Sequence, residues 1–152
     1  MDVRRPLAPF RRTETAAMHG TMLPVPLSHI ALVAFGGGLG AAGRLITTHL
    51  VNEYIMRPRL PWGTFAVNLI GSFLIGVIIM LTIEHGGTSR TRLLFITGLL
   101  GGFTTFSAFS FEISEMLMDR RVGPAIVYAA GSVVLCVLGT LAGAYLTRLL
   151  AR

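Results

Sequence analysis

Four long apolar segments, separated by short polar stretches, set the pattern of this chain. They cover approximately residues 27–51, 62–83, 93–118 and 122–150. A helix that crosses the hydrocarbon core of a bilayer needs about 20 predominantly apolar residues, and each segment is long enough for that. The pattern predicts an all-α membrane protein, with four transmembrane helices in one domain over residues 27–152.

The composition supports a membrane protein and argues against a nucleic-acid partner. Hydrophobic residues make up 53% of the chain and charged residues 13%, whereas about a quarter of a soluble domain is charged. The net charge of +6 comes from arginines in the N-terminal tail and at segment ends, not on one continuous face, so we expect no nucleic-acid partner. Residues 1–26 hold four arginines and four prolines but no long apolar run, which predicts a disordered tail.

The positive charges between the segments are balanced across the predicted membrane. Lysines and arginines in short loops set orientation, and this chain has no lysine. One side would hold four arginines and the other side four, namely Arg90, Arg92, Arg148 and Arg152 against Arg57, Arg59, Arg120 and Arg121. This balance favours insertion in both orientations and an antiparallel homodimer. A single orientation set by the tail is the alternative.

Glycines and hydroxyl residues interrupt the third segment. Gly101 and Gly102 are followed by two threonines, and glycine weakens a helix by about 1 kcal/mol relative to alanine. A broken helix at membrane depth is tolerated only inside protein or beside a water-filled cavity. We therefore predict unwound backbone over residues 101–104, with freed carbonyls of the kind that bind cations.

Two phenylalanines follow this predicted break. Phe106 and Phe109 are three residues apart and share a helix face, while Ser107 and Ser110 share a neighbouring face. Aromatic edges carry the positive part of the ring quadrupole, so edges directed at a pore would attract an anion without a full counter-charge. Core packing is the alternative for the two rings.

Further polar positions recur at helical spacing in the second and fourth segments. Asn68 is a buried amide by position, and Tyr128, Ser132 and Cys136 form a stripe along one face. Each of these groups needs a partner or water within hydrocarbon. Hydrogen bonds between helices and contact with a passing anion both meet that need. Glycine pairs four residues apart, as at Gly36 and Gly40, favour close helix approach.

The charged residues point to no catalytic or metal site. Arg44 in the first segment suits attraction of anions, a structural pairing or snorkelling to the membrane surface. Glu112 and Glu115 have no histidine or further carboxylate beside them at a metal-binding or catalytic spacing. No nucleophile with its base and no phosphate-binding loop is present, so we expect no enzyme.

Four stretches together resemble the Fluc (CrcB) family of fluoride channels. They are residues 37–44, residues 63–73, residues 101–110 with Glu112, and the spacing of Tyr128 and Ser132. The third stretch is the most specific of the four. The resemblance covers nearly all of the chain beyond the tail.

The resemblance implies an antiparallel, dual-topology homodimer in the lipid bilayer of the cell membrane, the inner membrane in a Gram-negative source. It implies two pores for fluoride, and a structural sodium ion (Na+) held by the carbonyls of Gly101 and Thr104. The implied pore residues are Asn68, Phe106, Phe109, Ser107, Ser110, Ser132 and Tyr128, with Arg44 and Glu112 as vestibule or structural charges. Cys136 stands where the family often has a second hydroxyl.

The function that these expectations favour is passive export of cytoplasmic fluoride, which lowers its toxicity. A small dual-topology multidrug exporter is an alternative, but it needs a membrane-embedded carboxylate in its first helix, and the first segment has none before Glu53. A membrane assembly factor that transports nothing is a further alternative. It would tolerate loss of Asn68 and Phe106.

Overall fold

The computed structural model describes residues 25–55, 60–84 and 86–151. Within these residues it contains four helical spans long and apolar enough to cross a membrane, Leu27–Tyr54, Trp62–Glu84, Ser89–Met118 and Val122–Leu150, and no strand. This confirms the predicted all-α membrane class. The tail predicted over residues 1–26 lies, up to residue 24, outside the described residues.

Three of the spans are nearly continuous helices, and the third is not. The first span is α1 (Leu27–Leu50) with a short π-helical extension, η1 (Val51–Ile55). The second and fourth are α2 (Trp62–Glu84) and α6 (Val122–Leu150). The third span consists of four pieces in succession, which are α3 (Ser89–Thr91), the π-helix η2 (Arg92–Leu100), α4 (Gly101–Phe103) and α5 (Phe106–Met118).

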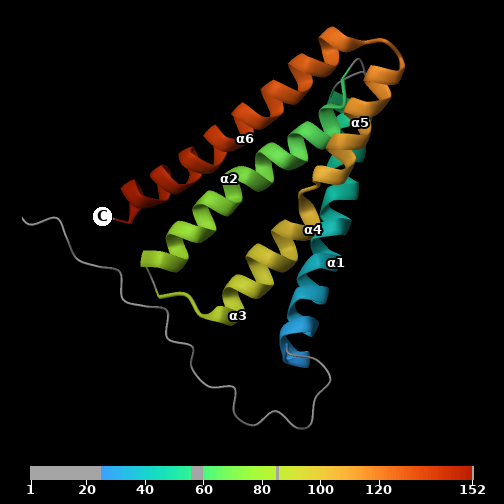
Figure 1. Ribbon diagram of the computed structural model, residues 1–152. Helices are drawn as coiled ribbons and strands as arrows, with labels where there is room; N and C mark the ends of the chain where they lie inside the picture. The colour runs from blue at the N-terminus through green and yellow to red at the C-terminus, as the bar shows by residue number, and fades with distance from the viewer. Residues whose placement is uncertain (1–24, 56–59, 85, 152) are drawn as a thin grey trace, which may run out of the picture.

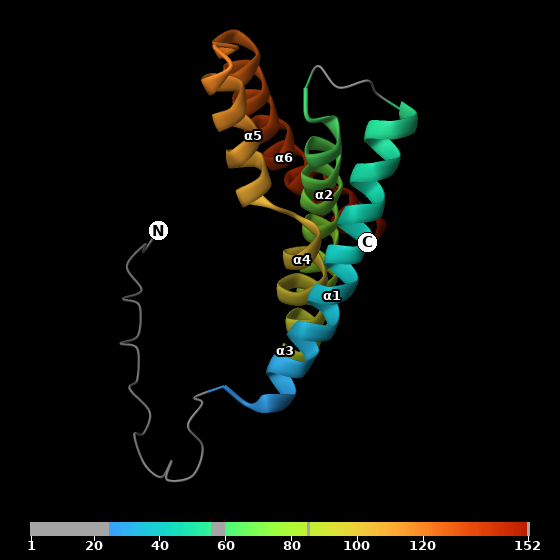
Figure 2. The same cartoon turned by 90° about the vertical axis from the view of Figure 1, so that its right-hand side faces the viewer.

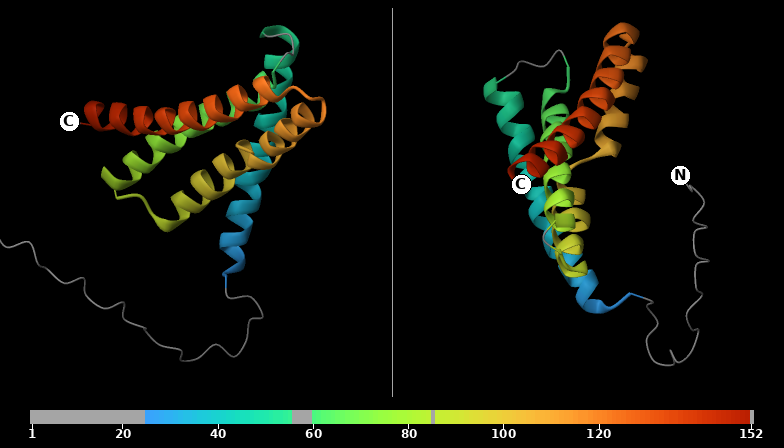
Figure 3. Two further views of the ribbon diagram at one scale, coloured as in Figure 1. Left: turned by 45° about the horizontal axis from the view of Figure 1, so that its top comes forward. Right: turned by 90° about the vertical axis from the view of Figure 1, so that its left-hand side faces the viewer.

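The helices pack in two groups that share the third span (Figures 1 and 2). α6 lies along α2, and α1 packs against η2 and α4. After the break the chain turns, so that α5 leaves α1 and packs against α6. Two further views show the same pairing of α2 with α6 (Figure 3). The break therefore divides the third span between two sets of neighbours.

Glycines make the closest helix approaches. A Cβ at Gly40 would meet the backbone of Leu99 and Phe103, and one at Gly143 would meet the Phe73 carbonyl. The close helix approach predicted for the glycine pair Gly36 and Gly40 is therefore confirmed on α1, and Gly143 makes a similar contact on α6. Few side chains are deeply buried; the compact core consists of Phe109, Met116, Ala125 and Tyr128. Large apolar side chains cover much of the remaining surface, as a protein surrounded by lipid requires.

The break in the third span is confirmed, and its predicted position over residues 101–104 is right at Thr104 but wrong for residues 101–103. Gly101–Phe103 is helical, and the extended residues are Thr104 (φ −76°, ψ 156°) and Thr105 (φ −150°, ψ 120°). Gly102 packs against α1, where a Cβ would collide with the Gly37 carbonyl. The glycines here thus permit helix contact, and the unwinding occurs at the threonines after them.

Candidate functional site

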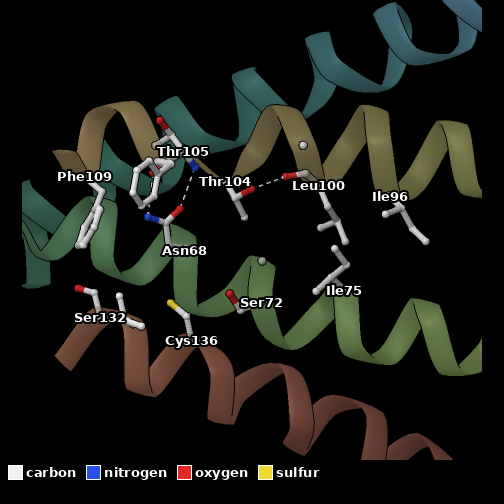
Figure 4. A pocket seen from close by; sticks show the side chains of 14 residues that line it. Asn68, Ser72, Ile75, Ile96, Leu100, Thr104, Thr105, Phe109, Ser132 and Cys136 are labelled. Atoms are coloured by element: carbon white, nitrogen blue, oxygen red, sulfur yellow. Dashed lines mark hydrogen bonds between the residues drawn. The ribbon is translucent and has the colours of Figure 1, made fainter. Parts of the chain in front are cut away.

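A cavity of about 320 Å³ lies beside the break, between the third span, α2 and α6 (Figure 4). Apolar side chains make up most of its wall, with polar groups at a few positions. Its lining residues are Asn68, Gly71, Ser72, Ile75, Ile96, Leu100, Gly101, Thr104, Thr105, Phe106, Phe109, Ser132, Val133 and Cys136. A largely apolar wall with a few convergent polar groups is typical of a binding site or a pathway for a small solute.

The cavity brings together residues predicted from three separate segments. Asn68 comes from α2, Phe106 and Phe109 from α5, and Ser132 from α6. Gly101 and Thr104, which the family resemblance assigns to sodium, also line it. The other predicted residues, which are Ser107, Ser110, Tyr128, Arg44 and Glu112, do not line this cavity.

The side-chain amide of Asn68 forms hydrogen bonds to the break through both its oxygen and its nitrogen. Its Oδ1 accepts a hydrogen bond from the Thr105 backbone N–H at 2.8 Å, and its Nδ2 donates to the Thr105 carbonyl at 3.0 Å. The side chain thus replaces, for one residue, the partners that a helix would have supplied. An amide nitrogen carries two hydrogens, so Asn68 keeps one further donor beside the cavity.

The break removes the usual helical donors of four carbonyls, those of residues 101–104, and the new partners of two of these donors are observed. In a continuous helix the N–H of Thr105 would bond to the Gly101 carbonyl, and the N–H of Ala108 to the Thr104 carbonyl. Instead the first N–H bonds to Asn68, and the second bonds to the Thr105 Oγ1 at 3.1 Å, as in a helix N-cap. Carbonyls freed of their helical donors in this way are a common type of cation site in membrane proteins.

The neighbouring carbonyl of Leu100, by contrast, accepts two hydrogen bonds. It accepts both the backbone N–H and the Oγ1 hydroxyl of Thr104, each at 2.9 Å. The carbonyls of Gly101 and Thr104, which the family resemblance assigns to sodium, are two of the four that lose their helical donors. Backbone oxygens without donors suit a small hard cation, so these two residues fit the implied ion, and the pattern does not single them out from residues 102 and 103.

Three aromatic rings form a row beside the cavity. The ring centroids of Phe106 and Phe109 are 5.4 Å apart, and those of Phe109 and Tyr128 are 5.5 Å apart. Phe109 is 7% exposed, whereas Phe106 is 76% exposed on this single chain although it lines the cavity. The row thus leads from a packed interior position to an open face.

Ser132 places a buried hydroxyl beside the cavity. It is 5% exposed, and its Oγ has no hydrogen-bond partner among the described residues. An unsatisfied buried hydroxyl costs about 1–3 kcal/mol, and here the hydroxyl belongs to a cavity-lining residue. Cys136, one turn further along α6, lines the same cavity and has no disulfide partner.

Glu112 lies in a hydrogen-bonded group that the sequence did not reveal. Its two carboxylate oxygens accept from the Thr64 hydroxyl and, at 2.8 Å, from the Tyr128 hydroxyl. The group joins α2, α5 and α6, and Tyr128 also packs on Phe109. The available signal for Thr64 was its place one helical turn before Asn68, on the same face.

The remaining predicted residues lie near the break or on α1. The Ser107 hydroxyl is 3.1 Å from the Thr105 Oγ1, and the Ser110 carbonyl accepts from the Ser114 hydroxyl at 2.9 Å. Arg44 lies on α1, outside the cavity lining. Glu112 also borders a second, more polar cavity of about 350 Å³.

Comparison with known proteins identifies the family and the relatives that this sequence matches. Residues 31–144 match the family described as CrcB-like protein, camphor resistance (CrcB). The chain is 40% identical over 123 residues to a fluoride-specific ion channel FluC of Mesorhizobium japonicum, covering 79% of this chain and 96% of the relative. It is 45% identical over 123 residues to one of Novosphingobium aromaticivorans, covering 78% and 94%.

Replacing Tyr128 by Phe should destabilise the protein, because one oxygen of the Glu112 carboxylate then loses its donor. We expect a loss of about 1–3 kcal/mol in the free energy of unfolding, measured as a lower thermal unfolding temperature in detergent. Tyr145→Phe on the same helix, at a side chain 66% exposed, is the matched control and should have little effect. Equal shifts in the two variants would contradict a stabilising role for the group.

Proposed function

This chain belongs to the CrcB family, and from that premise we propose that it is a fluoride-specific ion channel of the cell membrane. It is a multi-pass membrane protein and not an enzyme, and it lets cytoplasmic fluoride leave passively, which lowers fluoride toxicity. The observation that carries this proposal is the convergence of Asn68, Phe109 and Ser132 on one cavity beside a broken membrane helix.

The chemistry of the cavity suits a small, strongly hydrated anion. A pore for such an ion must replace water with donors and still bind weakly enough for release. The second N–H of Asn68 and the unpartnered hydroxyl of Ser132 supply donors. The ring edges add partial positive charge. No arginine lines the cavity, so no full positive charge holds the anion there.

The structure does not favour a proton-coupled drug exporter. In the span Leu27–Tyr54 the acidic residue is Glu53, which lies in η1 near the end of the span. The carboxylate of Glu112, in the third span, already accepts two hydrogen bonds. Such an exporter needs a carboxylate free to exchange protons for a cationic substrate.

We further propose that the working unit is an antiparallel homodimer in the bilayer. The balance of arginines between the two sides supports both orientations. Phe106 lines the cavity but is largely uncovered on one chain, and a second copy would cover it. Its ring would then complete a pore wall that a single chain leaves open.

We also propose that a structural sodium ion binds at the centre of this dimer. The unpaired carbonyls of Gly101 and Thr104 support it, because two copies would supply four oxygen ligands from uncharged backbone. When bound, the ion adds a fixed positive charge and joins the two breaks. It is a structural component and is not transported.

The channel proposal predicts selective efflux. Purified protein in liposomes loaded with fluoride and chloride should release fluoride and retain chloride, as measured with ion-selective electrodes. Equal efflux of both ions, or of neither, would rule out a fluoride-specific channel.

Phe109→Ile should assemble normally but lower fluoride efflux by about tenfold, because isoleucine keeps the bulk and removes the polarised ring edge. The measurement is initial efflux from liposomes at equal protein content. Phe35→Ile on the exposed face of α1, where the side chain is 65% exposed, is the control. Unchanged efflux in Phe109→Ile would leave that ring with a packing role only.

A structural sodium ion predicts a specific dependence of transport on sodium. Protein prepared and held without sodium should lose fluoride efflux and regain it when sodium returns. A sodium gradient across the membrane should not drive fluoride uphill. Fluoride movement that followed the sodium gradient would make sodium a transported ion and the protein a coupled carrier.

A further inference from the structure

Both the oxygen and the nitrogen of the Asn68 side chain form hydrogen bonds with a single residue at the break in the third span. Its amide pairs with the N–H and the carbonyl of Thr105, 37 positions later in the chain. A residue that only lined a pore would not need two hydrogen bonds to the same backbone unit. The pairing therefore determines the conformation of the break itself.

The Thr105 N–H has two competing acceptors. One is the Gly101 carbonyl, its partner in a continuous helix, and the other is the Oδ1 of Asn68, which it bonds at 2.8 Å. If Asn68 is absent, the N–H is available to the Gly101 carbonyl, and a carbonyl engaged in a helix is a poorer ligand for a cation. The choice of acceptor at Thr105 thus determines whether the Gly101 carbonyl is available.

The Thr105 side chain has a similar effect on the Thr104 carbonyl. Its Oγ1 accepts the Ala108 N–H at 3.1 Å, so the Thr104 carbonyl is left without that helical donor. Asn68 therefore takes the helical donor of the Gly101 carbonyl, and Thr105 takes that of the Thr104 carbonyl. These are the two carbonyls assigned to sodium.

We propose that Asn68 is a positioning residue for the sodium ion, since it holds the Gly101 carbonyl unpaired, with Thr105 doing the same for Thr104. The proposal rests on the structural sodium ion of the proposed function. Asn68 also lines the cavity and keeps one N–H beside it. The residue that faces the conducted anion therefore also sets the affinity for the structural cation, and the two sites share one side chain.

The test measures sodium binding separately from transport. The full chain in detergent is titrated with sodium at constant ionic strength, with N-methylglucamine as the replacement cation, and the thermal unfolding temperature is followed by the fluorescence of its single tryptophan, Trp62. In Asn68→Leu, which keeps the bulk but has no polar atoms, the sodium concentration for half of the stabilisation should rise by about tenfold.

Ser72→Ala is the matched control for Asn68→Leu. Ser72 lies one turn further along α2 and lines the same cavity, but its hydroxyl does not hold the break. We expect this variant to keep the sodium midpoint of the unmodified chain, whatever its fluoride efflux. A midpoint shifted equally in both variants would overturn the assignment to Asn68.

Thr105 provides a second route if Asn68→Leu does not fold. Thr105→Ala removes the cap from Ala108 and should raise the sodium midpoint, while Thr105→Ser keeps a hydroxyl at the same place and should restore it. An unchanged midpoint in Asn68→Leu or in Thr105→Ala would overturn the inference.

Fluoride efflux from the same preparations separates this inference from the channel function. If the unmodified chain conducts fluoride selectively but shows no stabilisation by sodium, the sodium role and this inference both fall and the channel remains. If the unmodified chain does not conduct fluoride, the efflux measurement contradicts the channel proposal independently of the sodium titration.

Discussion

Backbone polar groups at membrane depth must have partners, and the rest of this structure depends on how the break at Thr104 and Thr105 meets that constraint. An unsatisfied backbone group in hydrocarbon costs several kcal/mol. Here the side chain of Asn68 supplies the partners of Thr105, and the Thr105 hydroxyl caps the helix that follows. What remains is a small number of carbonyls around the break that have lost their helical donors, and these are the groups on which the proposed sodium site depends.

The same break directs the final part of the third span toward α6. α5 leaves the α1 side of the molecule (Figure 2), which places Phe109 against Tyr128 and next to the cavity. The hydrogen bonds from Thr64 and Tyr128 to Glu112 then hold the redirected helix to both α2 and α6. One irregularity in the backbone thus produces the cavity, the row of rings and the unpaired carbonyls together.

The sequence was sufficient to predict the four spans and the interrupted third segment, because hydrophobic length and glycine content are local signals. It placed the start of the unwinding too early, at Gly101 instead of Thr104, because a glycine such as Gly102 equally permits close packing against another helix, and only the contact with Gly37 distinguishes the two. The pairing of Asn68 with Thr105 spans 37 positions, and no spacing rule connects them. For Asn68 the sequence left helix bonding and anion contact open, and the observed geometry leaves room for both.

The distance from the Thr105 amide nitrogen to its acceptor tests this account most directly. In protein reconstituted in bilayers, solid-state NMR with a labelled Thr105 nitrogen can compare its distances to the side-chain carbonyl carbon of Asn68 and to the backbone carbonyl carbon of Gly101. We expect the shorter distance to Asn68, in keeping with the 2.8 Å separation of nitrogen and oxygen. A shorter distance to Gly101 would mean that the helix is continuous there, and would contradict a break held open by Asn68.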